Sequence, residues 1–207
     1  MASMRRAILL INTVWVMSDQ DLHRNAQDKA QFEAQEKARE QSFIKSLRSG
    51  NRTAILATLK DIRSSGTVTI LPEVFDVLME QEDEQIYNEA VSLINDLKSK
   101  ESVPYLTDAI ADAEFASIRQ ELVASCWQNG LSYSKHIGLF VKVALNDPYA
   151  TAIEAFTVIE GCIGDVAENE LQQQINYIRQ HISSADPEKH LLLHELIKVM
   201  ESYDKFD

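Results

Sequence analysis

The chain of 207 residues has few glycines, few prolines and almost no cysteine, with six, four and two of them respectively. Glycine and proline most often interrupt helices, so their scarcity favours a mostly helical chain. Two cysteines are too few for a disulfide framework, and Cys126 and Cys162 lie too far apart in the sequence to suggest a clustered metal site. We therefore predict that both thiols are buried core groups of a protein from the reducing cytoplasm.

Basic residues are also scarce. The sequence contains 20 Lys and Arg against 32 Asp and Glu, which gives a formal net charge of −12. A surface of this sign repels nucleic-acid phosphates and anionic lipids, which argues against a general role with nucleic acid or at a membrane. A basic protein partner stays open, beside the simpler explanation that the charge keeps a soluble protein soluble.

Hydrophobic runs long enough to cross a bilayer are missing as well. An apolar run follows Arg5 and Arg6 and extends only from Ala7 to Met17. Its charged start and its length are those of a signal peptide, but no small-residue cleavage site follows. Three interpretations of residues 1–17 stay open: an extension outside the native protein, with translation starting at Met17, a packed segment, and a signal peptide.

A polar segment occupies residues 18–41. It is rich in Gln, Glu, Ala, Lys and Arg, which favour helix, but it has little apolar surface to bury. We therefore predict a protruding polar helix that precedes a domain at 42–203, with a short tail at 204–207. The first amphipathic patch, around Phe43, should end at Ser49-Gly50-Asn51, which has the composition of a helix C-cap.

This domain contains a pattern that recurs at intervals in the low thirties. The pattern of Leu71–Leu78 recurs 32 residues later at Val103–Ile110. The pattern of Ile118-Arg119 recurs 35 residues later at Ile153-Glu154. Two helices per unit at such a period are the signature of an α-solenoid. We predict an all-α fold, an α-α superhelix of about five antiparallel helix pairs.

Helical periodicity and turn residues divide the domain into pairs, after a helix that opens at Thr53. The predicted pairs are Thr69–Glu80 with Asp83–Lys98, Ser102–Ala111 with Phe115–Gln128, Ser134–Leu145 with Pro148–Cys162, and Glu168–Ile182 with Pro187–Tyr203. No strand is predicted. The last helix has more apolar residues than one neighbour can cover. Three arrangements stay open: an ordinary end cap, a helix packed at an angle across the end of the stack, and a contact surface.

The unit from Ser102 to Gln128 resembles a HEAT-type repeat. It reads Val103-Pro104-x-Leu106-x-x-Ala109-Ile110-x-Asp112 and then Ile118-Arg119. These residues match the Val-Pro-x-Leu, Leu-x-Asp and Val-Arg elements of that family. The resemblance extends over residues 42–203 and is clearest in this unit. It implies a right-handed stack of antiparallel helix pairs, with second helices lining a concave face that usually binds protein.

The neighbouring units depart from the family pattern at one position. Arg119 is replaced by Tyr87 in the preceding unit and by Glu154 in the following one. The recurring Asp–Arg pairing of the family is therefore expected to be mostly missing. Its loss would make the superhelix less regular.

The sequence offers no recognisable catalytic set. His190 and His194 lie one helical turn apart and could supply half of a metal site, but no third ligand is recognisable and the zincin spacing is missing. Gly161 and Gly164 have the pattern of helix-ending glycines rather than of a phosphate-binding loop. We predict no catalytic residue, no metal and no cofactor.

The stronger candidates are binding residues on the second helices. If these helices line the concave face, the residue after each leading isoleucine points toward that face. An exposed tryptophan near the end of such a helix would be a natural hot spot, although the same ring could instead fill the space between units. The candidates are Tyr87, Asn88, Arg119, Gln120, Trp127, Gln128 and Glu154.

Together these features predict a non-catalytic, cytoplasmic scaffold that binds a protein partner on the concave face of a HEAT-like solenoid. One alternative is enzymatic, because some HEAT-like proteins are lyases or isomerases of bilin chromophores and others are DNA glycosylases. The glycosylase role needs a basic face, which a net charge of −12 opposes. The other alternative is a structural adaptor that self-associates through its terminal helices.

Overall fold

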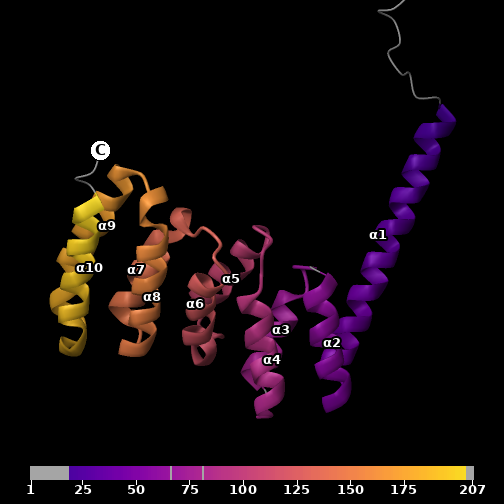
Figure 1. Ribbon diagram of the computed structural model, residues 1–207, viewed down its shortest axis with the longest axis horizontal. Helices are drawn as coiled ribbons and strands as arrows, with labels where there is room; N and C mark the ends of the chain where they lie inside the picture. Colours follow the sequence, from indigo (N-terminus) through magenta and orange to yellow (C-terminus); the bar gives the residue numbers. More distant parts are fainter. Residues whose placement is uncertain (1–18, 66, 81, 204–207) are drawn as a thin grey trace, which may run out of the picture. The chain divides into compact units, whose positions relative to one another are not determined.

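The computed structural model describes residues 19–65, 67–80 and 82–203, with side chains from residue 29 onward. The predicted extension at 1–17 and the predicted tail at 204–207 lie outside these residues. Over the described ranges the chain forms α-helices and short 3-10 turns and no strand (Figure 1). The predicted all-α class is therefore confirmed for this part of the chain.

The chain divides into two compact units, Met1–Ser42 and Phe43–Asp207. The first helix, α1 (Asp19–Leu47), supplies the described part of the first unit and the first residues of the second. Within the first unit, every described side chain is exposed or half-buried, and Phe32 is 64% exposed. Exposed ion pairs one turn apart, such as Lys29–Glu33, accompany the high helix propensity of this segment.

The second unit continues with helices that lie close to the predicted ranges. Within this unit α1 ends at Leu47, and the φ of +67° at Gly50 confirms the predicted helix stop, because a residue with a side chain rarely adopts this conformation. The helices are α2 (Arg52–Ser65), α3 (Leu71–Glu80), α4 (Glu84–Asn95), α5 (Ser102–Ala111), α6 (Arg119–Gln128), α7 (Ile137–Asn146), α8 (Tyr149–Cys162), α9 (Glu168–His181) and α10 (His190–Tyr203).

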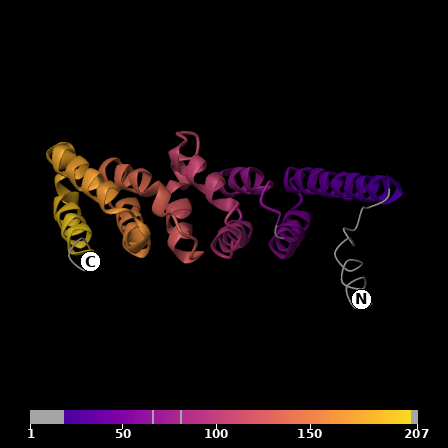
Figure 2. The same ribbon diagram turned by 90° about the horizontal axis from the view of Figure 1, so that it is seen from above.

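The helices of the second unit pack in pairs. Each odd-numbered helix from α3 to α9 contacts the even-numbered helix that follows it. The even-numbered helices, here called the second helices, also contact one another in order, α2 with α4, α4 with α6, α6 with α8 and α8 with α10. Figure 2 shows these pairs following one another in chain order from α2 to α10. Neighbouring second helices therefore share one continuous set of contacts.

Four of the second helices, α4, α6, α8 and α10, bury the same positions. If the first buried residue is numbered i, then i+4, i+7 and i+8 are buried as well, which is one face of a helix. The matching sets are Ile86, Ala90, Leu93, Ile94 in α4; Ile118, Leu122, Ser125, Cys126 across the start and body of α6; Thr151, Ala155, Val158, Ile159 in α8; and Lys189, Leu193, Leu196, Ile197 at α10.

This shared pattern corrects the predicted equivalence of Glu154 with Arg119. Aligned by burial, Arg119 corresponds to Tyr87 and to Ala152, whereas Glu154 corresponds to Glu121. The predicted register is wrong by two residues in α8. The leading isoleucine of the sequence pattern, Ile153, is an exposed residue, so it could not mark the core face.

The packing also shows how the two cysteines are buried and which side of the last helix is exposed. Cys126 and Cys162 are 1% and 5% exposed and form no disulfide, so the prediction of buried core thiols is confirmed. In α10 the buried apolar residues face α8 and α9, while His194 and Lys198 are exposed. This polar outer side is typical of an end cap, although Leu191 stays 74% exposed.

Candidate functional site

The predicted binding residues lie on α4, α6 and α8, where side-chain hydrogen bonds join neighbouring helices. The Tyr87 hydroxyl donates to Glu121 Oε1 over 2.7 Å, which links α4 to α6. The Asn95 amide donates to Gln128 Oε1 over 2.9 Å between the same two helices. Several of the predicted residues therefore serve the contact between units.

Tyr87 is a structural link rather than a free binding group. It is half-buried, and burial together with the Glu121 carboxylate raises the pKa of Tyr87 to about 12. The other oxygen of Glu121, Oε2, is buried and has no hydrogen-bond partner among the described residues. The Tyr87 hydroxyl is thus the hydrogen-bond donor that the structure shows for this carboxylate, and its loss would leave the carboxylate poorly satisfied.

Arg119 also holds helices together. Its Nη1 donates to Asp147 Oδ1 over 2.7 Å, and its Nη2 donates to the backbone oxygen of Asp112 over 3.0 Å. The side chains of Arg119 and Asp147 are 18% and 15% exposed. A matching pair joins Arg52 at the start of α2 to Asp83 before α4. Asp–Arg pairing is therefore more frequent than the sequence comparison suggested, because Arg52 lies outside the units that were aligned.

Trp127 is the candidate that the structure leaves most open to solvent. The side chain is 45% exposed, so the ring does not simply fill the space between units. Its indole Nε1–H donates to Glu154 Oε2 on α8 over 2.7 Å, which fixes the orientation of the ring. Asn88 on α4 and Gln120 and Gln128 on α6 are exposed as well.

Sequence reasoning missed two exposed apolar residues on α8. Ile153 is 40% exposed and Tyr149, one turn before it, is 39% exposed. The signal that could have found Ile153 is its register. It lies two residues after the first buried residue of α8, and the equivalent positions of α4 and α6 are occupied by the exposed residues Asn88 and Gln120. We call Asn88, Gln120, Trp127, Gln128, Ile153 and Glu154 together the Trp127 surface.

The helices that carry the Trp127 surface have a one-sided charge. Arg119 is the one basic residue in α4, α6 and α8, and it is already paired with Asp147. The acidic residues of these helices are Glu84, Glu89, Glu121, Glu154 and Glu160. Three of them hold the same register: Glu89, Glu121 and Glu154 each lie three residues after the first buried residue of their helix.

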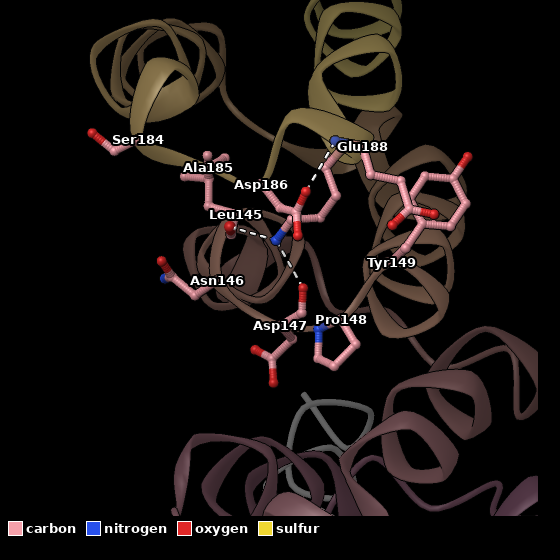
Figure 3. Close-up of a pocket in the computed structure, with 10 residues that line it drawn as sticks. Leu145, Asn146, Asp147, Pro148, Tyr149, Ser184, Ala185, Asp186 and Glu188 are labelled. Carbon is pink, nitrogen blue, oxygen red and sulfur yellow. Dashed lines mark hydrogen bonds between the residues drawn. The ribbon is translucent and has the colours of Figure 1, made fainter.

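A polar pocket of about 300 Å³ lies between the end of α7 and the segment before α10. Figure 3 shows Asp147 and Asp186, which are far apart in the sequence, both in this pocket. Lys189, which is 3% exposed, donates from Nζ to the backbone oxygens of Leu145 and Asp147 over 2.6 and 2.7 Å. Burial lowers the pKa of Lys189. Lys189 thus caps α7 and ties it to α10.

The residues considered for chemistry are placed in unreactive surroundings. Burial raises the pKa of Cys126 to about 12 and that of Cys162 to about 11, so both thiols stay protonated and are poor nucleophiles at neutral pH. His190 Nε2 lies 3.2 Å from the backbone oxygen of Ala185, and His194 is exposed. Among the described residues, no group of three or more His, Cys, Asp or Glu side chains is placed to hold a metal ion.

Two further findings bear on the functional class. None of the described helices is long and apolar enough to cross a membrane. In comparisons with known proteins, no protein family and no curated protein matches this chain. The functional argument therefore depends on the Trp127 surface itself.

Proposed function

We propose that this chain is a HEAT-like helical-repeat module that binds a protein partner on the face formed by its second helices. The repeated burial pattern and the ordered contacts from α2 to α10 support a solenoid, since each unit contacts its neighbours through equivalent positions. The Arg52–Asp83 and Arg119–Asp147 pairs support the HEAT resemblance, because both join one unit to the next.

The observation that carries this proposal is Trp127. A large aromatic ring that is 45% exposed would gain free energy by being covered, and tryptophan is among the residues that dominate binding energy at protein interfaces. The hydrogen bond to Glu154 holds the ring in one orientation before a partner arrives. A pre-ordered side chain loses less conformational entropy on binding, which increases affinity.

The distribution of exposed apolar residues supports the same surface. Outside α6 and α8, the other large exposed apolar side chains among the described residues are Phe32 on α1 and Leu191 and Tyr203 on α10. Trp127 and Ile153 come from two helices that contact each other, α6 and α8. An exposed apolar area that polar residues such as Gln128 surround is typical of a protein interaction site.

Site-specific photocrosslinking in the cells that make this protein tests the proposal. A photoreactive residue at Gln128 should crosslink a defined partner, whereas the same residue at Asp108, exposed on α5, should not. The Gln128 crosslink should disappear when Trp127→Ala is added. Crosslinks of equal yield at both positions, or a Gln128 crosslink that survives Trp127→Ala, would refute the proposed surface.

The choice of Trp127 as the test variant follows from the contacts. Arg119 and Tyr87 join helices through half-buried hydrogen bonds, so their removal would confuse loss of binding with loss of folding, whereas Trp127 joins α6 to α8 through one exposed hydrogen bond. Circular dichroism and the urea midpoint of the Trp127→Ala chain establish that it is folded. Recovery of the chain itself at the Gln128 crosslink would favour the self-associating adaptor instead.

A further inference from the structure

The charge of the helices that carry the Trp127 surface specifies the chemistry of its partner. Five glutamates and one arginine lie on α4, α6 and α8, and that arginine is already paired. A surface with this balance attracts a cationic segment and repels an acidic one. A second copy of the same surface, equally acidic, is disfavoured as the occupant for the same reason.

The acidic row is confined to the three middle second helices. Glu89, Glu121 and Glu154 occupy equivalent positions of α4, α6 and α8, whereas Leu192 occupies this position at α10 and α2 contains no glutamate. Helices packed in contact lie about 8–10 Å apart, so the row spans roughly 16–20 Å. An extended chain covers this length with about five or six residues at roughly 3.3 Å each.

Glu154 and Trp127 together form an anchor for one cation. The indole N–H occupies Glu154 Oε2, and a carboxylate has two oxygens with about four acceptor positions, so the group can still accept from a second donor. The exposed indole ring lies beside it. An arginine suits this arrangement because its planar guanidinium can stack on an aromatic ring while it donates to a carboxylate.

We propose that the Trp127 surface binds an extended, arginine-bearing peptide segment of a protein partner, with one arginine stacked on Trp127 and paired with Glu154. This inference depends on the proposed function, since it names the partner chemistry of that same surface. Glu89, the half-buried carboxylate at the other end of the row, attracts a further basic residue of the segment, whereas Glu121 is held by Tyr87. Binding should therefore weaken as salt is added.

Nuclear magnetic resonance with two matched peptides tests this inference on the full chain. The probes are acetyl-Gly-Arg-Ala-Leu-Arg-Gly-amide and the same peptide with citrulline in place of arginine, which keeps the shape and removes the charge. The sequence contains two tryptophans, Trp15 and Trp127, and the Trp127→Phe variant assigns their indole signals. The arginine peptide should shift the Trp127 signal and bind about three- to tenfold more tightly than its citrulline twin.

Two charge-neutralising variants show whether the anchor or the overall charge is responsible. Glu154→Gln keeps an oxygen for the indole N–H and removes the carboxylate charge, so it should weaken the arginine peptide about threefold or more and leave the citrulline peptide unchanged. Asp108→Asn removes the same charge from α5, outside this surface, and should change neither affinity measurably.

Each contrary outcome identifies what fails. Equal affinities for the two peptides would overturn the cationic partner, while the proposed function would survive if the Gln128 crosslink persists. Equal losses in Glu154→Gln and Asp108→Asn would overturn the anchor. Absence of any shift with either peptide would overturn the inference, and the crosslinking result would still decide the proposed function separately. Self-association in sedimentation that Trp127→Ala abolishes would identify a second copy as the occupant and overturn the inference.

Discussion

Arg52 and Arg119 occupy the same place in two different parts of the second unit. Each is the first residue of a second helix, and each donates to an aspartate just before the next second helix, Asp83 in one case and Asp147 in the other. Both nitrogen–oxygen distances are 2.7 Å. The Arg52 and Asp83 side chains are 54% and 32% exposed, whereas those of Arg119 and Asp147 are 18% and 15% exposed.

The difference shows that distance alone does not set the value of an ion pair. Water solvates and salt screens the Arg52 pair, so its contribution to stability is small. The Arg119 pair has lost most of its water, and removing one partner would leave the other charge poorly solvated. Arg119 Nη2 also donates to the backbone oxygen of Asp112, whereas Arg52 Nη2 donates to the exposed side chain of Gln85. The two sites therefore make a matched pair for experiment.

The largest expected effect is that of Arg119→Gln. Because the change leaves Asp147 half-buried without its cation and Asp112 without its donor, it should lower the free energy of unfolding by about 2–3 kcal/mol. Urea denaturation followed by circular dichroism measures the loss. A loss no larger than that of Arg52→Gln would show that burial does not distinguish the two pairs.

Lys189→Met should have the second largest effect. The change keeps an unbranched apolar side chain but removes the ammonium group, so the backbone oxygens of Leu145 and Asp147 both lose their donor. Relief of the buried charge offsets part of this loss, which leaves an expected cost of about 1–2 kcal/mol. Lys198→Met, at an exposed position of α10, is the control and should cost at most about 0.5 kcal/mol. Equal costs would mean that Lys189 does not cap α7.

Most of the fold could be predicted because its signals are local. Helix stops depend on neighbouring residues, so Gly50, with φ of +67°, follows the end of α1 where the sequence indicated. The units could be found because each buries one helical face at a regular spacing. The error at Glu154 arose because α8 keeps this spacing but begins its buried face with Thr151 rather than with an isoleucine, while Ile153 is exposed.

The candidate site was less predictable because its contacts cross between helices. Sequence placed Tyr87 and Arg119 on the same face as Trp127, but it could not show that the first two hydrogen-bond to neighbouring units while Trp127 stays exposed. Lys189 was missed for a related reason. It occupies a buried register position that Ile118 holds in α6, and only the carbonyls at the end of α7 make a lysine acceptable there.

Tyr87→Phe should have a smaller effect that depends on pH. Loss of the hydroxyl leaves Glu121 without its donor and should cost about 1 kcal/mol at neutral pH. The fold raises the pKa of Tyr87 from 10.0 to about 12, so it favours the protonated phenol. The contribution of the Tyr87 hydroxyl to the free energy of unfolding is fully present below pH 10 and is lost as the pH rises toward 12.

Unfolding free energies of both chains across this range give the measurement for Tyr87. The difference between wild type and Tyr87→Phe should shrink from pH 10 to 12, and tyrosinate absorbance should show one residue fewer titrating late in the variant. A difference that stays constant with pH would mean that the hydroxyl does not hold Glu121 in the folded chain.

Arg52→Gln should have the smallest effect and a different dependence on salt. The pair with Asp83 is solvated, so its loss should cost about 0.5 kcal/mol or less, and even this should fade as salt is raised toward about 1 M, where charges are screened beyond roughly 3 Å. The cost of Arg119→Gln should persist at the same salt, because little solvent reaches that pair. A parallel decline of both costs with salt would place the two pairs in the same environment. A decline at Arg52 alone would establish that the chain joins equivalent helices through two kinds of ion pair, one exposed and replaceable, the other shielded and required for the fold.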